Sequence, residues 1–410
     1  MPEFFNVLPP DDALQVLWKH LSPKLGTEII ETKDALGRIT SDSTRAPEDL
    51  PAFPRSSMDG FSVRSHDTFG ATEGLPAYFD IVGEVPMGEQ PNIRVSVGEA
   101  ATAYTGGALA DGADAVVMME HTQMIDESTI EVIKPTAPGE NVIQVGEDVT
   151  QGDIVIREGH ILRPQDLGGL LSLGITKIEV SKQVRVAIVS TGDELVPPET
   201  TPGPGQIRDI NTYTISALVE KNGGIAIPIT LAKDNYQEQR AAALLAISHG
   251  DIMVFSAGSS VSRHDMTADI IQNLGDPGVL VHGISLRPGK PTVAGVVNGK
   301  PAFGLPGNPV SAMVVFDLLV RPTIYLLGGC TSPPERQTIT ARLLRDIASQ
   351  TGREDYVPIN LITHNGKLCA EPIFGKSNLI YTLVRAHGVV KVSLNEGGLY
   401  AGEEVLVRLY

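Results

Sequence analysis

Cysteine is scarce in this sequence. Only Cys330 and Cys369 occur among 410 residues, too few for the disulfide framework of a small secreted domain. A zinc site would need further ligands, and no histidines cluster beside either cysteine. We therefore expect two reduced thiols in a cytoplasmic protein.

Positive charge is also in short supply. Lysine and arginine number 32 against 49 aspartate and glutamate residues, which gives a formal net charge of −17. Such a field repels polyanions, so we expect the protein to bind neither nucleic acid nor an anionic membrane surface. A small anionic ligand remains compatible with this charge where a few basic groups and backbone amides gather locally.

Long apolar runs are missing as well. No stretch comes near the roughly 20 uninterrupted apolar residues that span a bilayer. The N-terminus lacks the basic start and apolar centre of a signal peptide. We expect a soluble protein without a membrane segment.

What the chain does contain is a change of pattern along its length. Apolar residues at helical spacing predict two helices, one at 11–18, which begins with two acidic residues, and one at 164–173, which begins with a proline. Between them, short alternating runs rich in glycine and proline predict a β-rich module at about 41–147. With two to four domains expected for this length, the arrangement suggests one domain interrupted by another.

From residue 184 onward the pattern predicts an α/β domain, because apolar runs of strand length alternate with helical segments. The strands are expected at 184–189, 225–231, 252–255, 279–284 and 302–306, and the helices at 211–222, 237–247, 267–274 and 309–327. This alternation is typical of a largely parallel sheet covered on both faces. Alternating runs return after residue 329 and predict a small C-terminal β-domain.

Four loops at the expected carboxyl ends of these strands carry small, hydroxyl or acidic residues. They cover 190–194, 233–235, 256–265 and 304–309. Ligands bind beyond such strand ends, where glycines let backbone amides approach an anion and helix N-termini favour negative charge. Carboxylates there share a site with phosphate through a bridging Mg²⁺. Each loop alone is more often a plain turn or helix cap, but four together favour a binding site.

A basic bend at 287–291 is a second kind of feature. Arg287 and Lys290 flank a Pro-Gly pair, and such a local positive patch in an acidic protein suggests a phosphate or oxyanion clamp. A solvated hairpin with incidental charge is the better interpretation of this motif taken alone. The loops at 54–61 and 104–108 carry no functional signal by themselves.

Six motifs, taken together and in order, resemble the molybdopterin molybdotransferases, the molybdenum insertase family that includes the C-terminal half of gephyrin. The motifs are SMDGF at 57–61, TGGA at 105–108, GED at 146–148, STGDEL at 190–195, PGKP at 288–291 and LPGNPVSA at 305–312. The resemblance extends over essentially the whole chain.

The resemblance implies a multidomain α/β plus β fold of four domains. They are a split helical linker domain at 1–46 and 145–183, an inserted β-rich domain at 47–144, a molybdopterin-binding α/β domain at 184–329 and a C-terminal β-barrel at 330–410. It also implies a homodimer whose active site lies between the α/β domain of one subunit and the inserted domain of the other. The implied reaction is Mg²⁺-dependent insertion of molybdate into adenylylated molybdopterin, with release of AMP, in molybdenum cofactor biosynthesis.

Residue by residue, the resemblance implies a catalytic set comprising Asp59, Thr105, Glu194, Asp234 and Asp265. Glu194, Asp234 and Asp265 would hold Mg²⁺ against the pyrophosphate and neutralise charge on the leaving phosphate. The other implied positions bind nucleotide, pterin phosphate or oxyanion, the last at Arg287 and Lys290. They are Thr191, Gly192, Gly258, Ser260, Arg287, Lys290, Pro306, Gly307, Asn308, Arg353 and Ser377.

The sequence departs from the family pattern in the third loop. It reads Ala257-Gly258-Ser259 where Ser-Gly-Gly is common, with Arg263 and His264 before the aspartate, and Arg287 stands where lysine is frequent. A non-catalytic molybdopterin-binding carrier or scaffold and a tungstate-preferring insertase therefore stay open as alternatives. The adenylyltransferase step is a third, against which the extra domains argue. The molybdopterin adenylyltransferase and recipient apoenzymes are expected partners.

Overall fold

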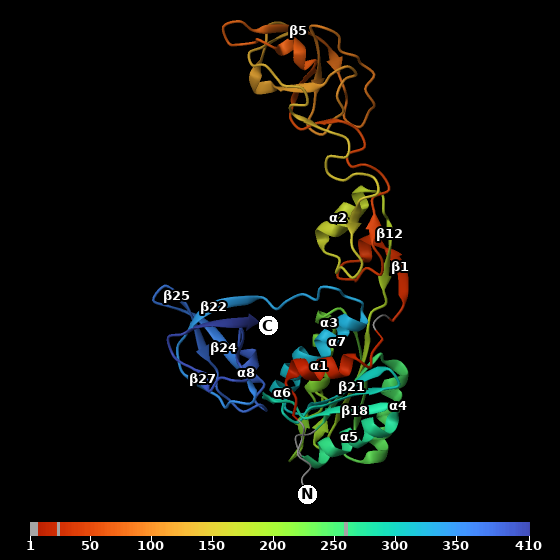
Figure 1. Ribbon diagram of the computed structural model, residues 1–410, viewed down its shortest axis with the longest axis vertical. Helices are drawn as coiled ribbons and strands as arrows, with labels where there is room; N and C mark the ends of the chain where they lie inside the picture. The colour runs from red at the N-terminus through yellow and green to blue at the C-terminus, as the bar shows by residue number, and fades with distance from the viewer. Residues whose placement is uncertain (1–6, 23–24, 258–260) are drawn as a thin grey trace. The chain divides into compact units, whose positions relative to one another are not determined.

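The computed structural model describes residues 7–22, 25–257 and 261–410, without the side chains of 261–265. The chain divides into two compact units (Figure 1). The larger comprises Met1–Asp42, Glu158–Arg163 and Lys177–Tyr410, and the smaller comprises Ser43–Arg157 and Pro164–Thr176. The boundaries of the four implied domains stay a prediction.

The larger unit contains a six-stranded sheet in the order β16-β13-β17-β21-β20-β18. Its strands are β13 (Arg185–Thr191), β16 (Ile225–Ala232), β17 (Ile252–Ala257), β18 (Pro277–His282), β20 (Val293–Val297) and β21 (Lys300–Pro306). The first four strands in this order run parallel, as predicted. The other two pairings are antiparallel, and β20 was not predicted. Asn298 and Gly299 both have positive φ and form the tight hairpin turn before β21.

Two apolar clusters cover the two faces of this sheet. Successive residues of β13 alternate between them: Val186 and Ile188 enter one cluster, and Ala187 and Val189 enter the other. The helices around the sheet are α1 (Pro10–Trp18), α3 (Asn211–Lys221), α4 (Tyr236–His249), α5 (Val261–Leu274), α6 (Pro309–Val315) and α7 (Arg321–Leu327). The predicted doubly covered α/β sheet is therefore confirmed, with an antiparallel edge.

The helical stretch Pro309–Leu327 is long and apolar enough to cross a bilayer, but 67% of that window is buried. It is thus a core helix of a soluble protein. The predicted helix from Pro309 to about Leu327 is confirmed as one helical stretch, with a π-helical segment at Phe316–Val320 between α6 and α7. Pro322 explains this local irregularity, since it has no N–H to donate to the carbonyl four residues earlier.

The C-terminal part of the larger unit is a closed β-sheet, which confirms the implied barrel. Its order is β19-β24-β25-β22-β28-β26, and β26 also pairs with β24. The strands are β19 (Leu286–Arg287), β22 (Thr338–Leu343), β24 (Glu354–His364), β25 (Lys367–Pro372), β26 (Gly388–Val392) and β28 (Glu404–Leu409). The short strand β19 comes from the α/β segment and pairs in parallel with β24, with Arg287 opposite Asp355.

The smaller unit is built on another six-stranded sheet, in the order β7-β4-β6-β5-β9-β8. The strands are β4 (Gly60–Val63), β5 (Ala77–Glu84), β6 (Glu99–Ala103), β7 (Ala115–Met118), β8 (Thr122–Met124) and β9 (Thr129–Val132). Phe61, Phe79 and Ile130 are buried together in its core. The predicted β-rich module is confirmed, and the predicted helix α2 (Pro164–Ser172) belongs to the same unit.

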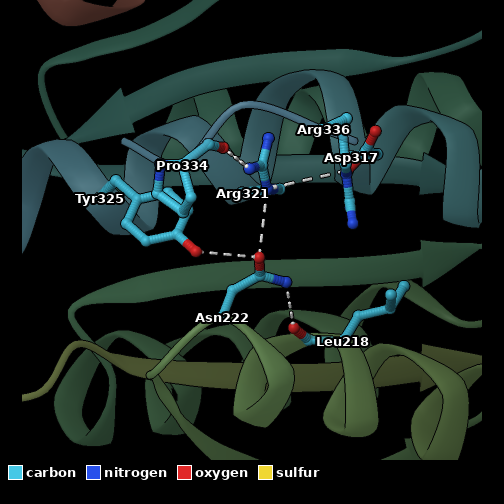
Figure 2. Close-up of polar contacts among 7 residues, drawn as sticks. All are labelled: Leu218, Asn222, Asp317, Arg321, Tyr325, Pro334 and Arg336. Carbon is cyan, nitrogen blue, oxygen red and sulfur yellow. Dashed lines mark hydrogen bonds and ion pairs between the residues drawn. The ribbon is translucent and has the colours of Figure 1, made fainter. Parts of the chain in front are cut away.

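A buried polar cluster connects α3 to α7 in the larger unit (Figure 2). Asn222 is 7% exposed, and its Oδ1 accepts hydrogen bonds from Arg321 Nε at 3.1 Å and Tyr325 Oη at 3.2 Å. Its Nδ2 donates to the Leu218 carbonyl oxygen at 2.6 Å. Burial raises the pKa of Tyr325, so the phenol remains a donor.

The same cluster holds the segment that leads to the barrel. Arg321 donates to the Pro334 carbonyl oxygen, and Arg336 Nε donates to Asp317 Oδ1 at 3.0 Å. The chain entering β22 is therefore tied to helix α7 and to the π-helical segment (Figure 2).

Replacing Asn222 tests how much this polar cluster stabilises the larger unit. Asn222→Ala leaves the Arg321 and Tyr325 donors without their shared acceptor, and we expect a loss of about 1–3 kcal/mol in the free energy of unfolding. Urea titration followed by tryptophan fluorescence measures the larger unit, because Trp18 is the single tryptophan and donates to Thr323 on α7. The exposed Asn395→Ala is the control and should unfold like the wild type; equal midpoints for both variants would contradict the prediction.

Candidate functional site

The loops after β13 and β16 bring carboxylates together. The Asp193 backbone N–H donates to Asp234 Oδ2 at 3.3 Å, and the Asp234 N–H donates to Asp193 Oδ1 at 3.1 Å. A Cβ atom at Gly192 would lie 2.9 Å from Glu194 Oε2, so glycine leaves room for this carboxylate. The predicted residues Gly192, Glu194 and Asp234 therefore lie on one rim of the sheet.

Buried polar groups line the carboxyl ends of the central strands. Thr191 is 1% exposed, and its hydroxyl has no hydrogen-bond partner within the described part of the chain. Asn211 Nδ2 donates to Ser256 Oγ at 2.7 Å and to the Gly307 carbonyl oxygen at 2.8 Å, while its Oδ1 is also unpartnered there. Since such groups cost free energy when unpaired, they mark a position for a polar ligand.

Asn211 and Ser256 escaped the sequence interpretation. Their positions in the predicted elements could have indicated a site, because Asn211 begins α3 and Ser256 lies near the end of β17. A polar residue at either position alone is common at a helix start or strand end. Only the fold shows that Asn211 connects Ser256 to Gly307, in the loop after β21.

A separate cavity of about 960 Å³ lies between the α/β part and the barrel of the larger unit. Many of the predicted ligand-binding residues line it, although they come from distant parts of the sequence. They are Arg287, Lys290, Pro306, Asn308, Arg353 and Ser377. Lys376 is a further basic residue of this lining that the sequence interpretation missed.

Two arginines of the cavity share one buried carboxylate. Asp355 is 3% exposed; its Oδ1 accepts from Arg353 Nε at 2.8 Å and its Oδ2 from Arg353 Nη2 at 3.3 Å. Arg287 Nη1 lies 3.8 Å from the same Oδ2. The pairing of β19 with β24 sets this geometry, because it places Arg287 opposite Asp355.

The other side of the cavity is held by the start of α6. Asn308 Nδ2 donates to Ser377 Oγ at 3.0 Å, and the Val310 N–H donates to the Ser377 carbonyl oxygen at 3.1 Å. These bonds also fix the backbone that carries Lys376. Among the described residues, four basic side chains and two carboxylates, Asp346 and Asp355, line the cavity. It is a locally positive site in an acidic protein, which suits an oxyanion.

The smaller unit brings the predicted pair Asp59 and Thr105 into contact. Asp59 Oδ1 accepts from the Thr105 backbone N–H at 2.8 Å and from its hydroxyl at 2.9 Å. These two hydrogen bonds lower the pKa of Asp59 below its ordinary value. Beside them, Tyr104 donates to Glu84 at 2.5 Å, which raises the pKa of the phenol.

The predicted magnesium ligands are only partly described. Gly258 and Ser260 lie outside the described residues, as does the side chain of Asp265. Among the described residues, no group of three or more His, Cys, Asp or Glu side chains could hold a metal ion. The ligand set Glu194, Asp234 and Asp265 therefore stays a prediction.

The fold and these clusters define a multidomain α/β protein with a polar strand-end site and an adjoining positive cavity. Family models match three consecutive parts of the chain. They are the MoeA N-terminal region (domain I and II) at residues 8–174, a probable molybdopterin binding domain at 187–325 and the MoeA C-terminal region (domain IV) at 340–410. The chain belongs to the MoeA family of molybdopterin biosynthesis proteins.

Relatives match over nearly their full length. A Methanocaldococcus jannaschii protein provisionally named as a molybdopterin biosynthesis protein is 34% identical over 98% of each chain. The molybdopterin molybdenumtransferase of Haemophilus influenzae is 31% identical over 97% of each chain. A crystal structure of the molybdopterin biosynthesis MoeA protein from Pyrococcus horikoshii has a TM-score of 0.86 at 30% identity, covering 99% of this chain and 100% of that one.

Titration of Asp59 tests the contact with Thr105. Thr105→Val removes the hydroxyl but keeps the backbone N–H, so the pKa of Asp59 should rise toward its ordinary value without reaching it. The wild-type carboxylate should accordingly stay ionised to lower pH than that of the variant. Carboxyl ¹³C NMR across an acid titration measures both.

Asp126 is the matched control for this titration. It lies in the same unit, and the backbone N–H and hydroxyl of Ser128 lower its pKa in the same way. Its titration should be identical in the wild type and in Thr105→Val. An unchanged Asp59 curve would show that the Thr105 hydroxyl does not stabilise the carboxylate.

Proposed function

We propose that this protein is a cytoplasmic molybdopterin molybdotransferase, which inserts molybdate into adenylylated molybdopterin and releases AMP. Two relatives at 31% identity carry the name molybdopterin molybdenumtransferase. The observation that carries the proposal is the positive cavity beside the polar strand ends of one compact unit. The substrates match these features, since molybdate is a dianion and the pterin substrate carries a diphosphate.

The cavity residues supply the oxyanion site in this proposal. Arg353 and Arg287 present planar guanidinium groups that can donate two hydrogen bonds each to one tetrahedral anion. Lys290 adds a mobile point charge at the exposed bend. Ser377 offers a hydroxyl whose position is held by Asn308. Together they would bind and orient molybdate.

The strand-end residues supply the phosphate site. The unpartnered Thr191 hydroxyl can donate to a phosphate oxygen, and the unpartnered Asn211 Oδ1 can accept from an N–H or O–H group of the nucleotide or pterin. Glu194 and Asp234 offer the carboxylate oxygens that Mg²⁺ prefers, and we propose Asp265 as their third partner. Bound Mg²⁺ would neutralise charge on the diphosphate during its cleavage.

Asp59 has a different part in this proposal. A carboxylate with a lowered pKa is a weak proton acceptor near neutral pH, so we assign it to orientation of a charged or hydrated group. Thr105 keeps it ionised and fixes its direction. We propose a catalytic role for Asp59 because the SMDGF and TGGA motifs resemble those of the molybdopterin molybdotransferases.

Removal of either predicted carboxylate tests the activity. Asp59→Ala and Glu194→Ala should each lower AMP release from adenylylated molybdopterin by at least about a hundredfold, with Mg²⁺ and molybdate present and the fold intact. Asp126→Ala, an exposed acid of the smaller unit, is the control and should keep full activity. Normal turnover by either variant would count against the proposal. Wild-type protein that binds molybdopterin tightly without releasing AMP would favour the alternative of a non-catalytic molybdopterin-binding carrier. Repeating the assay with tungstate in place of molybdate measures which oxyanion the protein prefers.

Mixing the two inactive variants tests the proposed homodimer. If each active site takes Asp59 from one subunit and Glu194 from the other, a dimer of the two variants contains one intact site. An equimolar, fully exchanged mixture should then recover about a quarter of wild-type activity. No recovery, despite subunit exchange shown by native mass spectrometry, would mean that both residues act within one chain. The adenylyltransferase and recipient apoenzymes are proposed as partners on the resemblance alone.

A further inference from the structure

Asp355 occupies an unusual position beneath the positive cavity. It is almost completely buried, yet it lines the cavity and contacts both of its arginines. We propose that Asp355 is a positioning residue of the oxyanion site: it holds Arg353 in the orientation that receives the anion and restrains Arg287 beside it. The identity of the anion as molybdate rests on the proposed function.

The two arginines are held unequally. Arg353 makes a two-point contact through Nε and Nη2, at 2.8 and 3.3 Å, and its side chain is 28% exposed. Arg287 is 3.8 Å away at its nearest atom, and its side chain is 65% exposed. Since a guanidinium has five N–H donors, the contact of Arg353 with Asp355 leaves other donors for a ligand. Arg353 is thus a fixed element of the clamp, and Arg287 can move toward the anion.

The backbone reinforces this arrangement. Arg287 and Asp355 are partners in the β19–β24 pairing, and the Glu354 N–H donates to the Ser285 carbonyl oxygen at 2.9 Å. Arg353 precedes this strand directly. The backbones of all three charged residues therefore belong to one local piece of sheet, where a displaced carboxylate would lose its two hydrogen bonds with Arg353.

Two physical effects of Asp355 oppose each other. Its negative charge lies under an anion site, so Coulomb repulsion alone would weaken anion binding. Its contact with Arg353 removes rotamer freedom before the anion arrives, which strengthens binding. Removing the charge should therefore tighten binding if repulsion dominates and weaken it if positioning dominates. The proposal requires the second outcome.

Glu354 provides a matched control on the same strand. It is also a buried carboxylate, but it accepts from Tyr356 Oη at 2.7 Å and pairs with Lys391. Neighbouring residues of a strand point to opposite faces, and Glu354 does not line the cavity. Glu354→Gln removes the same charge next to the site without touching the arginines.

The experiment is calorimetric titration of the full-length protein with sodium molybdate at constant pH and ionic strength. We expect Asp355→Asn to raise Kd by at least about tenfold, with Glu354→Gln within about twofold of the wild type. Asp355→Glu keeps the charge but displaces the carboxylate by one methylene, and we expect an intermediate Kd. Trp18 fluorescence shows whether each variant is folded. If Asp355→Asn is unfolded, the Kd of Asp355→Glu for molybdate tests the proposal in its place. Wild-type or tighter binding by the folded Asp355 variants would overturn the proposal.

Turnover separates this inference from the proposed function. AMP release by Asp355→Asn should show a raised KM for molybdate with little change in the KM for adenylylated molybdopterin or in kcat at saturating molybdate. If the wild type binds molybdate but releases no AMP, the function is wrong while the Kd comparison still holds. If the wild type turns over and Asp355→Asn has an unchanged molybdate KM, the inference is wrong and the function stands. Failure of the wild type to bind molybdate at all would overturn both.

Discussion

The pairing of β19 with β24 is the constraint on which the rest of the larger unit depends. A two-residue strand of the α/β segment joins the barrel sheet there, in parallel and with Arg287 opposite Asp355. The positive cavity exists because this pairing brings the two parts together. The cluster around Asn222 and Arg321 also ties the chain that enters the barrel to helix α7 (Figure 2), and the hydrogen bonds between the start of α6 and Ser377 add a further contact.

Much of this fold is readable from local pattern. Buried strands such as β13 and β17 are short apolar runs, and turn residues at their ends predict the loops that follow. The strand β20 was missed although Asn298-Gly299 is a strong hairpin signal. The π-helical segment at Phe316–Val320 is also consistent with a local signal, since Pro322 lies within the predicted helix. The missed strand came from an overlooked local signal.

The site was less accessible, for a different reason. Arg287 and Asp355 are paired only because two segments far apart in sequence meet in one sheet, and no periodicity records such a register. Arg353 and Ser377 were identified through the family resemblance, while Asp355 and Lys376 were not identified at all. In the sequence, Asp355 cannot be distinguished from any other polar residue of a strand, because only the structure shows its contacts with two arginines. Asp59 and Thr105 were likewise indistinguishable from loop residues by pattern alone.

The separation of the charged groups within the larger unit has a physical logic. Asp193 and Asp234 each accept the other's backbone N–H, which orients carboxylates without neutralising them. The two arginines of the cavity instead share one buried carboxylate, Asp355, and Lys290 and Lys376 also line the cavity, so that positive charge remains in surplus. Were the acidic rim and the cations in direct contact, they would form salt bridges with one another, and breaking these would oppose ligand binding. Keeping the two sets apart, each held by its own backbone contacts, leaves both able to act on a ligand that is itself charged.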